Sequence, residues 1–447
     1  MSLSRPLAGV GFAAALALSG CAVYRPAPLD EASEAALRGP DLAAAAADVA
    51  RLNHPRLKPV AIDLDQPLTP QALGLIAVVT NPDLKAARAK ARVADAQVFD
   101  AGLLPDPSLT FGMDHILSGP DTTEAFTTQV ALDLNAFRTR RVTRQIERGA
   151  RDQARLDLAW QEWQTAGQAR LLAARIVALT QALDLDGRSA STAEAALART
   201  LDAAARGDVR ADEVESRRLA AADASDKARQ AERDLDAARH DLNRLLGVAP
   251  QTRIRIAPQA PQTIDLEPEA LFTRARALRL DLRALEAGYG SQEAALRKAV
   301  MDQFPNLQLT VTRAQDTTGN QTIGPSVNFT LPAWNRNAGG IAIAKATREQ
   351  LRAEYAARLV ATRADIADLV AGLTMARRQR DELAAQAEPL ARLADQSDAA
   401  SARGDVSRAT AEAARQSVTD KQLALAALNQ SIAEQTVALE LAVGGPF

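Results

Sequence analysis

LLPDPSLTFGMD at residues 103–114 and FTTQVALDL at residues 126–134 decide the fold of this chain. In both stretches apolar side chains alternate with polar or small ones, a pattern typical of half-buried strands joined by a loop. The pattern recurs as FPNLQLTVTR at residues 304–313 and SVNFTLP at residues 326–332. We therefore predict four strands, at about 107–114, 126–134, 305–313 and 326–332.

Four short strands form too little sheet to close on itself within one chain. Strands of about eight to ten residues are long enough to cross a bilayer when tilted. In lipid, however, an open sheet would leave two edges of unpaired backbone groups, each costing several kcal/mol. Because known membrane barrels have about eight strands or more, closure requires further copies of the chain. The alternation itself does not choose between a dimer and a trimer.

The remainder of the chain is rich in Ala and charge and has helical periodicity. Lys plus Arg number 53 and Asp plus Glu 55, and aromatic residues make up only 3% of the sequence. The lack of a basic surplus argues against a nucleic-acid partner, and the scarcity of aromatics favours long helices in close contact. No Pro interrupts residues 138–206, so we predict a single helix of about 100 Å there.

An internal duplication organises the chain. LTPQAL at residues 68–73 recurs as LEPEAL at 266–271, and RGDV at 206–209 recurs at 403–406. Such self-similarity predicts two copies of one structural unit. Each copy is predicted to run helix, strand, strand, very long helix, turn, long helix, so the fold class is mainly α with a small membrane β part.

The first residues have the features of a targeting segment. Arg5 supplies a positive charge, residues 7–18 form a short apolar run, and two small residues precede Cys21. A run this short suits a signal peptide rather than a membrane span. LSGC resembles a bacterial lipobox, which implies that Cys21 is lipidated and that Ala22 directs the protein to the outer membrane. The alternative is an ordinary signal peptide with an incidental cysteine.

Since Cys21 is the only cysteine, disulfides are excluded. No apolar stretch after Cys21 is long enough for a transmembrane helix. The predicted segments are a lipoprotein signal peptide (1–20), a lipidated N-terminal tether (21–67), a first repeat (68–250) with its helical hairpin at about 138–247, a Pro-rich linker (251–265), and a second repeat (266–447) with its hairpin at about 337–444.

The sequence contains few candidate catalytic or metal-binding residues. His54, His115 and His240 are far apart in the sequence, whereas metal sites need several ligands converging at short range. We therefore expect each histidine to be solvated and predict no metal site and no cofactor. The sequence has no phosphate-binding Gly loop and no nucleophile motif, so we predict that the protein is not an enzyme.

Several stretches carry a resemblance to a known family. The sequences at 68–91, 101–112 and 331–346, with the two RGDV turns, resemble the TolC-like outer-membrane efflux proteins, or outer membrane factors. The sequence of residues 101–112 resembles the corresponding sequence in the cation-efflux branch of this family. The resemblance covers essentially 68–444 and implies a homotrimer, in which a twelve-stranded β-barrel in outer-membrane lipid continues as an α-helical barrel through the periplasm. It implies two partners, a periplasmic membrane fusion (adaptor) protein and an inner-membrane efflux pump of the RND type.

The same resemblance assigns the two helix turns to the periplasmic entrance of the tunnel, where they would dock on the adaptor. Gly permits the left-handed conformation that reverses a helix, and Asp can cap the returning helix. The alternative is that both are hairpin turns without a partner. The turn residues are Gly207, Asp208, Val209, Gly404, Asp405, Val406 and Ser407.

Some relatives narrow this entrance with acidic rings just past the second turn. At the corresponding positions this chain has Thr410 and Ala413. Asp395, Asp398 and Glu412 lie nearby and are candidate pore-lining acids, with solvated helix-face charges as the alternative we favour.

Two functions are compatible with these features. The first is a passive outer-membrane channel of a tripartite efflux system, carrying solutes delivered by the pump, metal cations among them if the branch resemblance extends to substrate. The alternative is a lipid-anchored periplasmic helical scaffold or adaptor without a pore. The four alternating strands and the duplication favour the channel.

Overall fold

The computed structural model describes residues 24–121, 123–258 and 267–446. The predicted signal peptide and Cys21 lie outside the described residues, as do residues 259–265 of the predicted linker. The chain divides into two compact units, Met1–Pro40 and Asp41–Phe447. The described part of the first unit contains the helix α2 (Leu29–Arg38).

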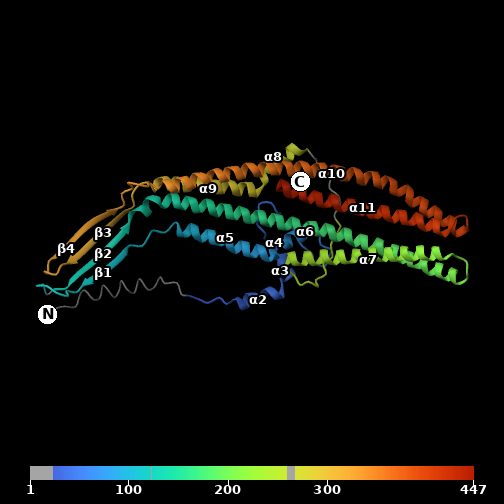
Figure 1. The fold of residues 1–447 in the computed structure, drawn as a ribbon, viewed down its shortest axis with the longest axis horizontal. Helices are drawn as coiled ribbons and strands as arrows, with labels where there is room; N and C mark the ends of the chain where they lie inside the picture. Colours follow the sequence, from blue (N-terminus) through green and yellow to red (C-terminus); the bar gives the residue numbers. More distant parts are fainter. Residues whose placement is uncertain (1–23, 122, 259–266, 447) are drawn as a thin grey trace. The chain divides into compact units, whose positions relative to one another are not determined.

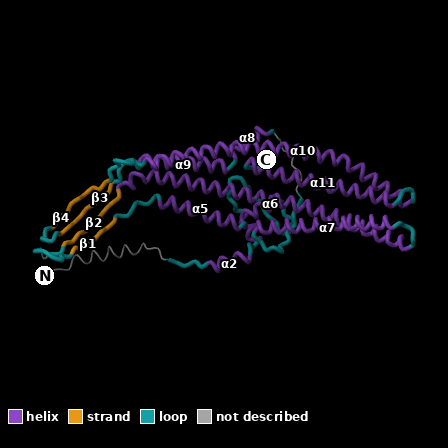
Figure 2. The backbone as a smooth tube through the Cα atoms, viewed as in Figure 1, coloured by secondary structure: helices purple, strands orange, loops and turns teal. Residues whose placement is uncertain are grey.

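The second unit contains two series of elements in the same order. Within this unit the four strands gather at one end, and the turns of the two long hairpins lie at the other (Figures 1 and 2). The elements are α3 (Leu42–Val49), α4 (Pro70–Thr80), α5 (Pro82–Asp100), β1 (Ser108–Asp114), β2 (Ala125–Asp133), α6 (Leu134–Ala205), α7 (Ala211–Leu246), α8 (Pro268–Leu278), α9 (Leu280–Met301), β3 (Leu307–Gln315), β4 (Gln321–Phe329), α10 (Ala338–Arg403) and α11 (Arg408–Val443).

The helix α6 is the central element of the second unit. Its 72 residues span about 100 Å, and it contacts α4, α5, α7, α9 and α11. Leu73 and Ile76 of α4 pack with Leu242 and Leu246 of α7 in the first core. A second core is built from α8, α10 and α11. In the described part of the chain, no helix combines the length and apolarity needed to cross a membrane.

Each repeat begins with two helices, not with the single helix that we predicted. Pro82 lacks a backbone N–H and so ends the α4 hydrogen-bond ladder, while the Asn81 side chain accepts a bond from the Leu84 N–H at 2.9 Å. In the second repeat the break falls at Arg279, whose guanidinium pairs with Asp281 at 2.7 Å. No Pro marks that break in the sequence.

The strands form one antiparallel sheet in the order β1-β2-β3-β4. The register aligns Leu109, Val130 and Val311 in one row across the first three strands. The neighbouring row, on the opposite face, contains Thr110, Gln129 and Thr312. One face is therefore mainly apolar, although Thr128 and Arg313 lie on it in the row of Phe111, and the other face is polar. Within the described chain, the outer edges of β1 and β4 have no partner strand.

The fourth strand differs from the predicted range of 326–332. It begins at Gln321, because the Asp316 carboxylate accepts bonds from the N–H groups of Thr318 and Asn320 and closes a short turn after β3. It ends at Phe329, which pairs with Leu307, the first residue of β3. Leu331 therefore lies beyond the sheet, although it continues the alternation.

The close approach of α4 and α6 generates a stability prediction. A Cβ at Gly74 would lie 2.8 Å from the backbone oxygen of Ala166, a group that cannot rotate away. We expect Gly74→Ala to lower the free energy of unfolding by about 1–3 kcal/mol. The control is Gly187→Ala, because a Cβ there meets no described atom within 4 Å.

The control variant should gain about 0.5–1 kcal/mol from higher helix propensity. Denaturant unfolding of both variants in detergent measures the two effects. Equal unfolding midpoints for the two variants would refute the predicted close packing of α4 on α6.

Candidate functional site: the hairpin turns and the cleft between the hairpins

The two hairpin turns have the same backbone geometry. Gly207 and Gly404 follow the outgoing helices with φ of +81° and +83°. The next residue in each turn bonds back to its helix: the Asp208 N–H donates to the Ala203 oxygen at 3.0 Å and the Asp405 N–H to Ala400 at 2.9 Å. A left-handed glycine followed by such a bond is a common end of a helix. It reverses the chain within a few residues.

The aspartates of the turns do not cap the returning helices, which corrects our expectation. Asp208 accepts from Arg206 Nε at 3.0 Å, and the second repeat has the equivalent pair Asp405–Arg403 at 2.8 Å. Ser407 caps α11 instead, through a 3.1 Å bond from the Thr410 N–H. The aspartates precede the capping positions, so their side chains turn back toward the outgoing helices.

The turns present small and charged groups to solvent. Gly207, Asp208, Gly404 and Asp405 are exposed, and Val406 is 36% exposed. Val209 is half-buried. The two turns thus share a Gly-Asp-Val surface with an exposed Arg–Asp ion pair. Their difference is the serine cap, which only the second turn has within the described chain.

The three candidate pore-lining acids occupy different environments. Asp395 is exposed, as expected for a solvated helix-face charge. Asp398 accepts from Arg415 Nε at 2.5 Å and so joins α10 to α11. Glu412 is not a solvated charge. Its carboxylate, 14% exposed, pairs with Arg199 of α6 at 2.6 Å and Arg217 of α7 at 3.1 Å.

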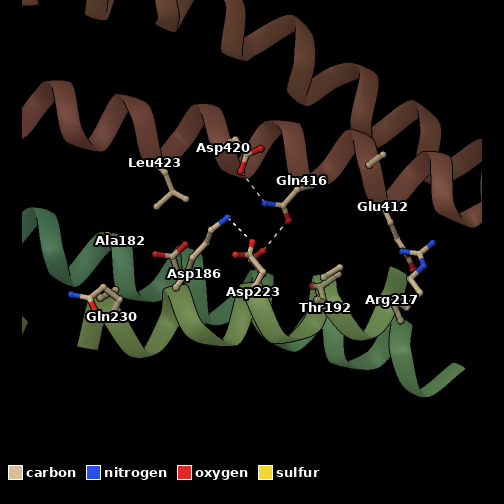
Figure 3. Close-up of a pocket in the computed structure, with 18 of the residues that line it drawn as sticks. Ala182, Asp186, Thr192, Arg217, Asp223, Gln230, Glu412, Gln416, Asp420 and Leu423 are labelled. Atoms are coloured by element: carbon tan, nitrogen blue, oxygen red, sulfur yellow. Dashed lines mark hydrogen bonds and ion pairs between the residues drawn. The ribbon is translucent and has the colours of Figure 1, made fainter. Parts of the chain in front are cut away.

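Glu412 borders a cleft of about 710 Å³ between α6, α7 and α11 (Figure 3). Carboxylates from the three helices line it: Asp186 of α6, Asp223 of α7 and Asp420 of α11. Lys227 lies 2.9 Å from the Asp223 carboxylate. The charged groups of the cleft are therefore mainly acidic, and the cleft separates the two hairpins next to the ion pairs that join them.

The acidic character of this cleft shifts two pKa values. Burial raises the pKa of Asp186; Lys227 opposes this shift and Asp420 adds to it. The hydrogen bond to Asp223 raises the pKa of Lys227. Since five carboxylates line the cleft against one arginine and one lysine, the cleft attracts cations rather than anions. Sequence reasoning missed this cleft because its acids lie far apart in the chain.

The histidines give no metal site. In the described part of the chain no group of three or more His, Cys, Asp or Glu residues has metal-binding geometry. His115 is exposed beside Glu124, 2.9 Å away, and His240 is exposed. The prediction of a solvated His54 is wrong, because its side chain is 0% exposed. It packs against Ala159 and Glu162 of α6.

The bridging position of Glu412 yields a prediction. In Glu412→Gln the guanidiniums of Arg199 and Arg217 lose their shared charge partner, so α11 should separate more readily from α6 and α7. Pulsed electron spin resonance between labels on α7 and α11 should show a longer or broader distance distribution than in the parent.

The matched control is Glu388→Gln. Glu388 is exposed and pairs with Arg392 of the same helix, α10, at 2.7 Å. Its removal leaves the contacts between hairpins intact, so the distribution should match the parent. An unchanged distribution in Glu412→Gln as well would show that the carboxylate does not hold the hairpins together.

Comparisons with known proteins agree with this geometry. The family described as outer membrane efflux protein matches residues 271–445. The fold is similar to that of CusC, with a TM-score of 0.70 and 17% identity, over 91% of this chain and 99% of CusC. It is also similar to the CmeC outer membrane channel of Campylobacter jejuni, with a TM-score of 0.73 and 16% identity, over 85% and 86% of the two chains. No curated protein sequence matches the chain closely enough to count as a relative.

Proposed function

We propose that this chain, whose residues 271–445 match the outer membrane efflux protein family, is a TolC-like outer-membrane efflux protein that serves as the passive exit duct of a tripartite efflux system. The single observation that supports this most strongly is the two-faced sheet with two unpaired edges. In a bilayer such edges must find partner strands. Three copies would supply twelve strands, four from each, and close the wall.

The two faces of the sheet suit the two sides of such a wall. Leu109, Phe111 and Ile323 on the apolar face are 71%, 69% and 75% exposed in the single chain, and the surrounding lipid would cover them. The polar face, with Thr, Ser, Gln and Asn side chains, would line a water-filled lumen. The proposed lumen carries few charges between its two ends.

The helices are proposed to form the periplasmic part of the duct. α6 at about 100 Å and α10 with 66 residues are long enough to carry the hairpin turns far from the membrane. The two Gly-Asp-Val turns would form the tunnel entrance and dock on a periplasmic membrane fusion protein coupled to an inner-membrane pump. Their exposed Val406 and ion-paired Asp405 offer that partner both apolar and polar contacts.

The duct itself is proposed to leave selection to the pump. The described residues hold no cluster that could bind a metal ion, so passage of metal cations would rely on the pump and on general attraction by acidic surfaces. We further propose that Cys21 carries a lipid that anchors the protomer to the outer membrane. These roles involve transport, not catalysis.

Conductance separates this proposal from the alternative of a periplasmic scaffold without a pore. The purified protein should run as a trimer in detergent and should produce discrete conductance steps in planar bilayers. A monomer that gives no conductance steps would support the scaffold.

Two substitutions on opposite faces of the sheet sharpen the test. Leu109→Arg places a charge in the apolar row that Leu109 shares with Val130 and Val311, which costs about 2–4 kcal/mol near the bilayer centre, so the variant should be depleted from outer-membrane fractions. Thr127→Arg lies on the polar face and should insert normally.

The Thr127→Arg channel should also show a reversal potential shifted toward anion permeation, because three added cations would face the lumen. Equal insertion of the two variants, or an unshifted reversal potential for Thr127→Arg, would contradict the assignment of the faces.

A further inference from the structure

We propose that His54 is a pH-operated latch that holds the segment of residues 52–57 against α6 and opens on acidification. The inference does not depend on the channel function. It rests on a buried imidazole whose two ring nitrogens both lie within hydrogen-bond distance of backbone groups.

The hydrogen bonds of the ring define its protonation state. Nδ1 accepts from the backbone N–H groups of Arg56 and Leu57, each at 3.0 Å. Nε2 lies 2.9 Å from the carbonyl oxygen of Ala159 in α6, which can only accept. The ring is therefore the neutral tautomer with its proton on Nε2. A second proton on Nδ1 would point at two N–H donors and abolish both bonds.

The same segment is attached to both repeats. Leu52 and Leu57 pack against the small core cluster formed by Val78, Leu84 and Ala166. Arg56 Nε donates to the Leu278 oxygen at the end of α8, at 3.0 Å. Through His54 the segment is held to α6 of the first repeat, and through Arg56 to α8 of the second. Opening the latch would loosen both attachments.

The charges around the ring oppose one another. On α6, Glu162 lies 3.7 Å from Nε2 and favours the imidazolium. That carboxylate is already shared with Arg88 of α5, whose Nη2 is 2.6 Å away. Arg88 and Arg56, the cation of the segment itself, disfavour a charged ring. Burial is the largest effect, and it lowers the pKa of His54 below its ordinary value of 6.5.

The sign of the pH effect follows from this lowering. The closed latch prefers the neutral ring, so its stability is fully present above about pH 6.5, where the released ring is also neutral. As the pH falls below that value, the released segment binds a proton that the closed form resists. The equilibrium constant for closing the latch therefore decreases as the pH falls from about 6.5 to the lowered pKa of His54. The total decrease is tenfold for each unit by which that pKa is lowered.

Hydrogen exchange of the full-length protein in detergent tests the latch. After correction for the intrinsic pH dependence of exchange, protection of the Arg56 and Leu57 amides should fall between pH 7.5 and pH 5, tenfold for each unit by which the pKa of His54 is lowered. In His54→Asn the side-chain oxygen can still accept these two N–H groups but does not titrate. That variant should show weaker protection that does not change with pH.

The matched control is His240→Gln, which removes an exposed histidine and should keep the parental pH response. His54→Ala should lose protection at every pH, and the Asn variant carries the test if the Ala variant misfolds. Parental protection that is constant from pH 7.5 to pH 5, or a fall that persists in His54→Asn, would overturn the proposal.

Discussion

Unpaired backbone at the two edges of a four-stranded sheet is the constraint on which this structure depends. The register leaves β1 and β4 without a partner in the described chain, and it separates apolar from polar side chains on the two faces. A sheet with one apolar and one polar face suits a wall between lipid and water. Since no single copy can close that wall, the chain is built to associate.

The long helices satisfy a different requirement. The outgoing helix of each hairpin, α6 or α10, follows a strand of the sheet, and the long helices extend away from the sheet (Figure 1). Small residues at close approaches, such as Gly74 against Ala166, allow backbones to pack tightly. Near the turns the contact between hairpins changes character, because ion pairs such as Glu412 with Arg199 and an acidic cleft replace apolar packing.

Local sequence signals predicted the hairpins and the strand faces well. α6 spans Leu134–Ala205 where 138–206 was expected, because a Pro-free run ending at Gly207 has few other ways to fold. The side-chain alternation of β1 could also be predicted from the local sequence. The bounds of β4 could not be predicted in this way, since they depend on pairing with β3 and on the turn at Asp316.

The surroundings of single polar residues could not be predicted from local pattern. His54 is buried by contact with Ala159, which is 105 residues away in the sequence. Glu412 is neutralised by arginines from two other helices, although its neighbours in the sequence suggest a solvated helix face. In both cases the residues that bury or pair with the side chain come from distant segments of the chain. The residue spacing within one helix therefore does not predict them.

The central claim is that each chain contributes only part of a membrane wall. Cryo-electron microscopy of the protein extracted in detergent tests it most directly. The account predicts three copies in a ring, with β1 of each copy hydrogen-bonded to β4 of its neighbour. Isolated single subunits, or strands that close within one chain, would contradict it.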